Sequence, residues 1–169
     1  MQFGSDNQTG CSPQVLQALI EANVGHSHGY GQDDWTARAV AALRDVFETD
    51  LEAYFVATGT AANGLALASL VQPWQQVLCH AQSHIATDES TAPEGFTGGA
   101  RVQAIACDEP KLTAQALRTH LARAGRDPPH NPQPGAVSIA QATESGLVYS
   151  PDEVAALAEC ARANAMALH

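Results

Sequence analysis

The chain has 169 residues, of which 45% are hydrophobic and 15% charged, enough for one globular domain with a core or for a large part of a bigger one. Asp and Glu total 18 against 8 for Lys and Arg, and the formal charge of -10 argues against a nucleic-acid partner and against an anionic membrane surface. No apolar run approaches the roughly 18 residues of a membrane span. Because the first ten residues also lack the pattern of a signal peptide, we expect a cytoplasmic protein.

Cysteine spacing predicts neither a zinc knuckle nor a disulfide scaffold. The four cysteines are far apart and form no C-x-x-C pair. We expect small thiols that pack partly inside the protein. They are Cys11, Cys79, Cys107 and Cys160.

The first third of the chain predicts two helices, and the rest alternates strands with helices. Ser12 and Pro13 are typical of a helix start, here over 13–23, and Asp33 can cap a second helix over 34–48. The alternation that follows predicts parallel crossovers, and therefore a three-layer α/β/α sandwich with a mostly parallel sheet. The expected strands are 51–57, 75–80, 101–107, 136–142 and 166–169, and the expected helices are 61–70, 112–125 and 150–165.

Ligands of open α/β sheets bind beyond the carboxyl ends of the strands, where this sequence first places Thr58-Gly59-Thr60. The glycine allows close backbone approach, directly before a helix whose first N–H groups and dipole favour an anion such as a phosphate. We expect Thr60 to be the N-cap. The alternative is a capped, tightly packed helix that binds nothing, and the short pattern leaves both open. It matches neither the dinucleotide nor the Walker motif.

The segment "CHAQSHIATDE" supports two interpretations. His80 and His84 are four residues apart with Asp88 and Glu89 following, which suits a divalent metal if the segment is a helix. However, His80 ends a predicted strand and a turn follows, so the two imidazoles should point apart. A single His84 that stacks on a ring and exchanges protons fits the pattern better, and we predict no metal site.

Seven segments, in order, resemble the N-terminal half of the low-specificity L-threonine aldolases of the β-eliminating lyase family. The resemblance implies a pyridoxal 5'-phosphate enzyme with the aspartate-aminotransferase type of large domain, which would cleave L-threonine, allo-threonine or other β-hydroxy amino acids to glycine and an aldehyde. The matching segments are "FGSDNQTGCSPQVLQAL", "GYGQDDWT", "VATGTAANGLALASL", "SHIATDESTAPEGFTGGA", "KLT", "SIAQATESGLVYSPDEV" and the final "MALH".

The resemblance also implies roles for individual residues. Gly59 and Thr60 would hold the cofactor phosphate, and His84 would stack on the pyridine ring and transfer the proton of the substrate hydroxyl. Glu89 would belong to the loop beside the ring. Some relatives have a histidine at the position of Glu144, and we assign Glu144 no proton transfer.

The same resemblance implies substrate contacts and an assembly. Ser5 would contact the substrate carboxylate, and Tyr30 lies in a segment that these enzymes lend to a neighbouring subunit. Residues 1–32 would then form substrate and interface loops and residues 33–169 the cofactor-binding large domain. The complete protein would be a homodimer or homotetramer.

Pyridoxal phosphate chemistry requires a lysine for the Schiff base and a carboxylate against the pyridine nitrogen. The sequence has one lysine, Lys111, which does not match the Schiff-base lysine of the family. In the family an Asp-Gly-Ala-Arg segment follows the strand that matches "MALH", and this chain stops at His169. We therefore expect a truncated large domain that is inactive alone. Other hypotheses are a small metal-dependent enzyme and a non-catalytic cofactor-binding domain.

Overall fold

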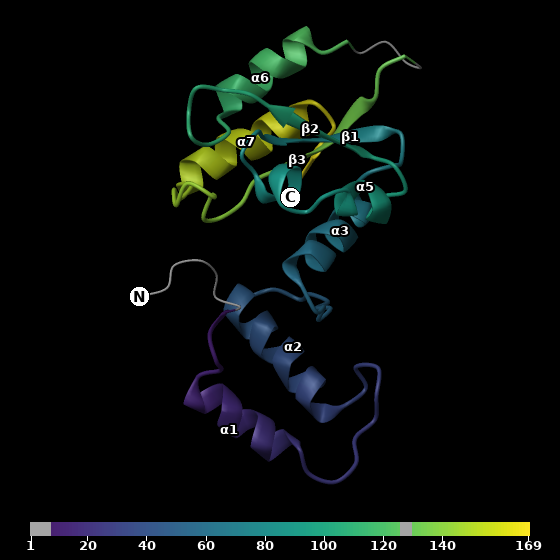
Figure 1. Cartoon of the computed structure of the whole chain (residues 1–169), viewed down its shortest axis with the longest axis vertical. Coiled ribbons are helices and arrows are strands. Elements are labelled where there is room, and N and C mark those ends of the chain that lie inside the picture. Colours follow the sequence, from purple (N-terminus) through teal and green to yellow (C-terminus); the bar gives the residue numbers. More distant parts are fainter. Residues whose placement is uncertain (1–7, 126–129) are drawn as a thin grey trace. The chain divides into compact units, whose positions relative to one another are not determined.

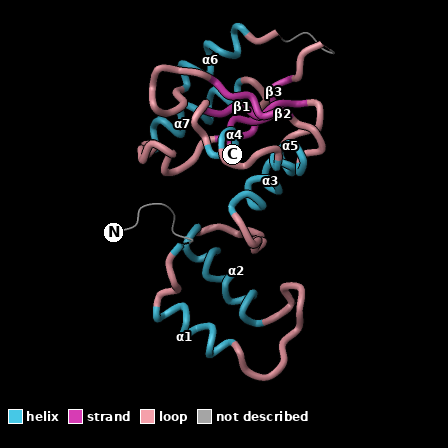
Figure 2. The backbone as a smooth tube through the Cα atoms, viewed as in Figure 1, coloured by secondary structure: helices cyan, strands magenta, loops and turns pink. Residues whose placement is uncertain are grey.

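The structure is a computed structural model that describes residues 8–125 and 130–169. It separates the chain into two units, Met1–Phe55 and Val56–His169. Figure 1 shows the elements along the chain, and Figure 2 shows the loops that join them. In the described ranges no helix is long and apolar enough to span a membrane.

The first unit contains two helices, α1 (Pro13–Ala22) and α2 (Asp34–Phe47), both close to their predicted bounds. The Ser12 hydroxyl accepts a hydrogen bond from the Val15 N–H at 3.3 Å, as expected for an N-cap. Asp33 accepts one from the Thr36 N–H at 2.8 Å, and this bond lowers the pKa of the Asp33 carboxyl. Both predicted caps are confirmed.

The second unit contains the sheet and the remaining helices. The strands are β1 (Gln75–His80), β2 (Arg101–Ile105), β3 (Gln133–Ser138) and β4 (Ala167–Leu168). They lie in the order β2-β1-β3-β4, and every pair is parallel. The helices are α3 (Gly59–Leu70), α4 (His84–Thr87), α5 (Ala92–Phe96), α6 (Ala114–Arg123) and α7 (Pro151–Ala163).

Helices cover both faces of the sheet, so this unit has three layers. Leu78 of β1 packs with Leu117 of α6 and Leu157 of α7, whereas the next residues along β1, Val77 and Cys79, pack on the other face with Leu67 of α3. This alternation follows from the period of two along a strand. Figure 1 shows α6 and α7 on one side of the strands and α3 and α5 on the other. The predicted three-layer architecture is confirmed.

Three element predictions need correction. Residues 51–57 form no strand in the structure, and Tyr54 and Phe55 are 85% and 62% exposed, because an apolar run becomes a strand only where another strand pairs with it. The third strand runs over Gln133–Ser138 rather than 136–142, since its pairing with β1 already begins at Gln133. The turn predicted after His80 is present at 81–82, and two short helices that were not predicted, α4 and α5, follow it before β2. Thr60 is not the N-cap of α3, as described below.

Candidate functional site

A crevice opens at the carboxyl ends of β1 and β3, where the order of the strands reverses. The chain leaves β1 for β2 on one side and later enters β3 on the other side of β1. Open parallel sheets bind ligands at such a point. The crevice holds a cavity of about 340 Å³, lined by Asn63, Ser83, His84, Ile85, Ser138, Ile139, Ala140, Gln141 and His169. The cavity therefore combines residues from four separate parts of the second unit.

His84 occupies the cavity wall, with its side chain 53% exposed. Its backbone N–H donates a hydrogen bond to Glu144 Oε1 at 2.6 Å, which ties the loop after β1 to the loop after β3. Its ring Nδ1 lies 2.8 Å from Glu89 Oε1. Backbone and ring are thus both held, while about half of the side chain stays exposed.

Glu89 lies in the turn between α4 and α5, and its side chain has no exposed surface. Oε1 accepts a second hydrogen bond from the Asn63 amide Nδ2 at 2.7 Å. Oε2 has no partner among the described residues. A buried carboxylate is stable only with strong hydrogen bonds, so Asn63 and His84 together explain how Glu89 is accommodated.

The start of α3 differs from the prediction in its cap. Thr58, rather than Thr60, is the N-cap, and its hydroxyl accepts a hydrogen bond from the Ala61 N–H at 3.1 Å. The helix begins two residues earlier than predicted, because Thr58 already has the extended backbone that an N-cap needs. Gly59 and Thr60 therefore lie inside the first turn, whose N–H groups point away from the helix body.

Gly59 has open space around it. A Cβ at this position would meet no atom of the described residues within 4 Å, and its backbone is not left-handed. Packing and backbone geometry therefore do not require a glycine at position 59. A ligand that comes close to the backbone would explain the glycine, and the first turn of a twelve-residue helix suits a phosphate.

His169 closes the cavity at the end of β4. Its Nδ1 lies 2.9 Å from the Ser138 hydroxyl. Burial lowers the pKa of the His169 imidazole, and the negative charge of Glu89 acts in the opposite direction. The neutral ring is thus favoured in the folded chain.

The metal alternative finds no support. Within residues 8–125 and 130–169 no group of three or more His, Cys, Asp or Glu side chains is arranged to hold a metal ion. His80 Nε2 lies 3.1 Å from the Glu109 carbonyl, whereas His84 contacts Glu89 and Asp88 accepts from the Thr87 hydroxyl. The two imidazoles have separate partners because a turn, and not a helix, joins them.

The resemblance predicted substrate or interface roles for two further residues, Ser5 and Tyr30. Ser5 falls outside the described residues. Tyr30 belongs to the first unit, and its side chain is fully exposed in a turn with φ of 62°. A bulky residue with positive φ is strained. The role predicted for each residue stays a prediction.

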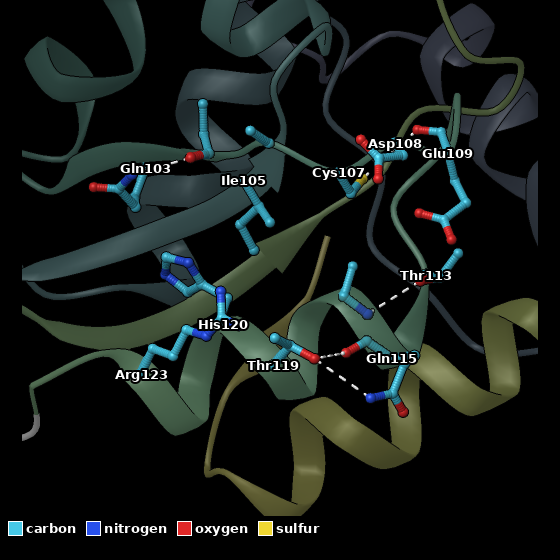
Figure 3. A pocket seen from close by; sticks show the side chains of 13 residues that line it. Gln103, Ile105, Cys107, Asp108, Glu109, Thr113, Gln115, Thr119, His120 and Arg123 are labelled. Carbon is cyan, nitrogen blue, oxygen red and sulfur yellow. Dashed lines mark hydrogen bonds between the residues drawn. The ribbon is translucent and has the colours of Figure 1, made fainter.

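A second cavity, of about 420 Å³, lies between β2 and α6 (Figure 3). Asp108 and Glu109 lie at one end and His120 and Arg123 line another part of its wall. Gln115 and Thr119 bond to each other through their side chains. Because it lies along the edge strand β2, this cavity contains none of the predicted site residues.

Sequence reasoning missed two contributors, Asn63 and Glu144. Asn63 was visible as the one amide in the first turns of an otherwise apolar helix, four residues after Gly59. Glu144 was assigned no proton transfer, and its observed bond is to the backbone of His84 rather than to the ring. The parallel pairing of β1 with β3 brings Glu144 to His84, and Asn63 of α3 reaches Glu89 across 26 residues, so neither partner was readable from local spacing.

Comparison with known proteins identifies the family of this chain. A sequence profile described as beta-eliminating lyase matches residues 2–169. The chain belongs to the beta-eliminating lyase family. It is 43% identical over 168 residues to the low specificity L-threonine aldolase of Pseudomonas aeruginosa, covering 99% of this chain and 48% of that protein. It matches the corresponding enzyme of a Pseudomonas species with the same identity and coverage.

A solved structure supports the fold. The threonine aldolase of Leishmania major superposes with a TM-score of 0.87 at 27% identity, covering 95% of this chain and 46% of that one. The predicted family and fold class are confirmed. The 169-residue chain spans about half the length of the curated relatives that it matches.

Proposed function

We propose that the crevice binds pyridoxal 5'-phosphate and belongs to an aldolase that cleaves β-hydroxy amino acids. The observation that carries the proposal is the cavity that brings His84 together with Asn63 of α3, the helix whose first turn contains Gly59 and Thr60. Family membership supports it, since two relatives named low specificity L-threonine aldolase match nearly the whole chain.

The donor set fits this cofactor. Gly59 and Thr60 offer backbone N–H groups, and Thr60 a hydroxyl, to a doubly charged phosphate at a helix N-terminus. The flat imidazole of His84 offers a surface for the pyridine ring. Glu89 acts beside the ring through His84, because its own carboxylate is enclosed.

In the reaction, L-threonine or allo-threonine loses its Cα–Cβ bond and gives glycine and acetaldehyde. When bound, pyridoxal phosphate supplies an electron sink for the pair left on Cα. His84 accepts the proton of the β-hydroxyl, so that the oxygen forms the carbonyl of the aldehyde as the Cα–Cβ bond breaks. A proton then replaces Cβ on Cα, which completes glycine.

Lys111 does not carry the cofactor in this proposal. Its ammonium lies 2.7 Å from the Glu153 carboxylate and 3.0 Å from the Val148 carbonyl, and its side chain is 19% exposed. It is the chain's one lysine and does not line the crevice. We therefore expect Lys111 to form no covalent bond with the cofactor.

The remaining assignments follow from the family resemblance. Ser5 contacts the substrate carboxylate, and Tyr30 serves the site of a neighbouring subunit. The protein is a cytoplasmic homodimer or homotetramer whose substrate is a small amino acid.

Activity of the protein expressed from its intact genomic reading frame tests the function. Loaded with pyridoxal phosphate, it should release acetaldehyde and glycine from L-threonine or allo-threonine. His84→Asn should lower kcat by about 10²-fold or more, the usual effect of losing a general base. Cofactor binding without turnover of any β-hydroxy amino acid would instead identify a non-catalytic binding protein.

A further inference from the structure

Glu89 receives two hydrogen bonds at a single oxygen. His84 Nδ1 and Asn63 Nδ2 lie 2.8 Å and 2.7 Å from Oε1. The three residues come from α4, the turn after it and α3. An amide nitrogen can only donate, so Oε1 acts as an acceptor in this cluster.

The same oxygen sets the proton position on His84. A neutral imidazole carries its proton on one nitrogen, and the hydrogen bond made by that ring selects which one. If Nδ1 carried a lone pair, two lone pairs would face each other at 2.8 Å. The proton therefore belongs on Nδ1, and Nε2, which has no hydrogen-bond partner in the described part of the chain, keeps its lone pair.

We infer that Glu89 and Asn63 are positioning residues that hold His84 as the Nδ1–H tautomer and leave Nε2 as a proton acceptor. The inference deepens the proposed function and rests on it for its catalytic meaning. Asn63 orients the carboxylate, the carboxylate orients the ring, and Glu144 holds the backbone beneath it. A proton acceptor aimed in advance at the cavity reduces the reorganisation needed during reaction.

Asn63 helps to hold the carboxylate of Glu89 in place through its hydrogen bond to Oε1. Because Oε2 of Glu89 lacks a partner in the described residues, the carboxylate is held only through Oε1. Asn63→Ala removes one of the two bonds there. The remaining bond to His84 keeps the Nδ1 proton, but the ring gains freedom, so its tautomer signal should broaden while keeping the same pattern.

Nitrogen NMR of the full chain, without cofactor or substrate, tests the inference. The histidines are labelled with ¹⁵N, and His84 is assigned by the signals lost in His84→Gln. At a pH where imidazoles are neutral, long-range ¹H–¹⁵N spectra distinguish the two tautomers. The expected pattern for His84 is Nδ1–H.

Glu89→Gln is the decisive variant, because its amide keeps the shape of Glu89 but replaces the anionic acceptor with a weaker, neutral carbonyl oxygen and adds an NH2 donor that can face Nδ1. We expect the Nε2–H form to increase at the expense of the Nδ1–H form. The matched control is Glu94→Gln, which changes a neighbouring carboxylate that accepts from the Val102 N–H instead. The control should leave the His84 pattern unchanged, and backbone amide spectra of both variants should show that the fold is retained.

A majority Nε2–H form in the unaltered chain would overturn the inference, as would an unchanged Nδ1–H pattern in folded Glu89→Gln. If Glu89→Gln does not fold, the spectrum of the unaltered chain decides alone. The proposed function fails separately, if a phosphorylated pyridoxal analogue does not perturb the amides of Gly59 and Thr60.

Discussion

Lys111 joins the start of α6 to the start of α7. Its ammonium contacts the Glu153 carboxylate and the Val148 carbonyl, and lies 5.1 Å from the centre of the Tyr149 ring. These contacts involve residues 37 to 42 positions along the chain. Such a lysine serves the fold, which agrees with the proposal that it does not bind the cofactor covalently.

The hydrogen bond from Lys111 is the largest cause of the lowered pKa of Glu153. A carboxyl whose folded pKa is lowered adds stability above its usual value of 4.5, and this stability is lost as the pH falls through the folded pKa. We expect Lys111→Met to weaken this acid-side dependence. Urea unfolding between neutral pH and about pH 3.5 measures it, with Glu153→Gln as control. An unchanged pH profile would contradict the ion pair.

Borohydride reduction tests the proposal that Lys111 forms no covalent bond with pyridoxal phosphate. The chain is mixed with pyridoxal phosphate at stoichiometric ratio, reduced and digested. We expect no selective label on Lys111, because its nitrogen is held by Glu153 and Val148. Stoichiometric labelling at Lys111, mapped by mass spectrometry, would show that this lysine does carry the cofactor.

Tyr149 fixes the loop before α6 through its hydroxyl, which accepts a hydrogen bond from the buried Leu112 N–H at 2.9 Å. Burial raises the pKa of the Tyr149 phenol, so the neutral form persists at physiological pH. Tyr149→Phe leaves the Leu112 N–H without its partner, and should cost about 1–3 kcal/mol in the free energy of unfolding. A decrease in the free energy of unfolding of less than a few tenths of a kcal/mol, measured by urea unfolding, would mean that water replaces the hydrogen bond.

At the scale of elements, α3 contains two glycines with opposite roles. A Cβ at Gly64 would lie 2.5 Å from Phe96 Cδ2 of α5, whereas one at Gly59 would meet nothing within 4 Å. Gly64→Ala should therefore destabilise the chain by about 1–3 kcal/mol through overpacking. Gly59→Ala should leave stability unchanged or raise it, because alanine favours helices. Thermal unfolding of both variants makes the comparison, and equal effects would contradict it.

The two threonines at the start of α3 form a second matched pair. Thr58→Ala removes the cap on the Ala61 N–H and should cost about 1 kcal/mol of stability. Thr60→Ala keeps the cap, so its effect should fall on phosphate binding instead. Urea unfolding and phosphate titration separate the two. Equal losses of stability would mean that Thr60 shares the cap.

Local chemistry in the sequence was sufficient for several elements. Ser12 and Asp33 marked their helices correctly, since capping depends on residues only three positions apart. Residues 51–57 were wrongly predicted to form a strand, because a run of apolar residues does not reveal whether another strand is present to pair with that segment. Thr58 and Thr60 both suit a cap, and only the backbone conformation decided between them.

At the scale of the whole molecule, the crevice depends on strand order. His84 and the first turn of α3 were readable from motifs and from the family resemblance. The partners of His84 were not, because Glu144 is 60 residues away from it along the chain and Asn63 is 26 residues away from Glu89. The bond to Glu144 follows from placing β1 beside β3, and the bond from Asn63 follows from the packing of α3 near the turn after α4. Sequence alternation predicts this arrangement only as a fold class.

Titration of the ¹⁵N-labelled chain with pyridoxamine phosphate tests the central claim most directly. This analogue keeps the ring and phosphate but has no aldehyde, so it reports the crevice without reacting with amines. We predict saturable shifts of the Gly59 and Thr60 amides and of the His84 ring, and affinity about tenfold weaker in Gly59→Ala, which corresponds to ~1.4 kcal/mol. Binding that leaves these signals unmoved, or that is equally tight in Gly59→Ala, would contradict the account.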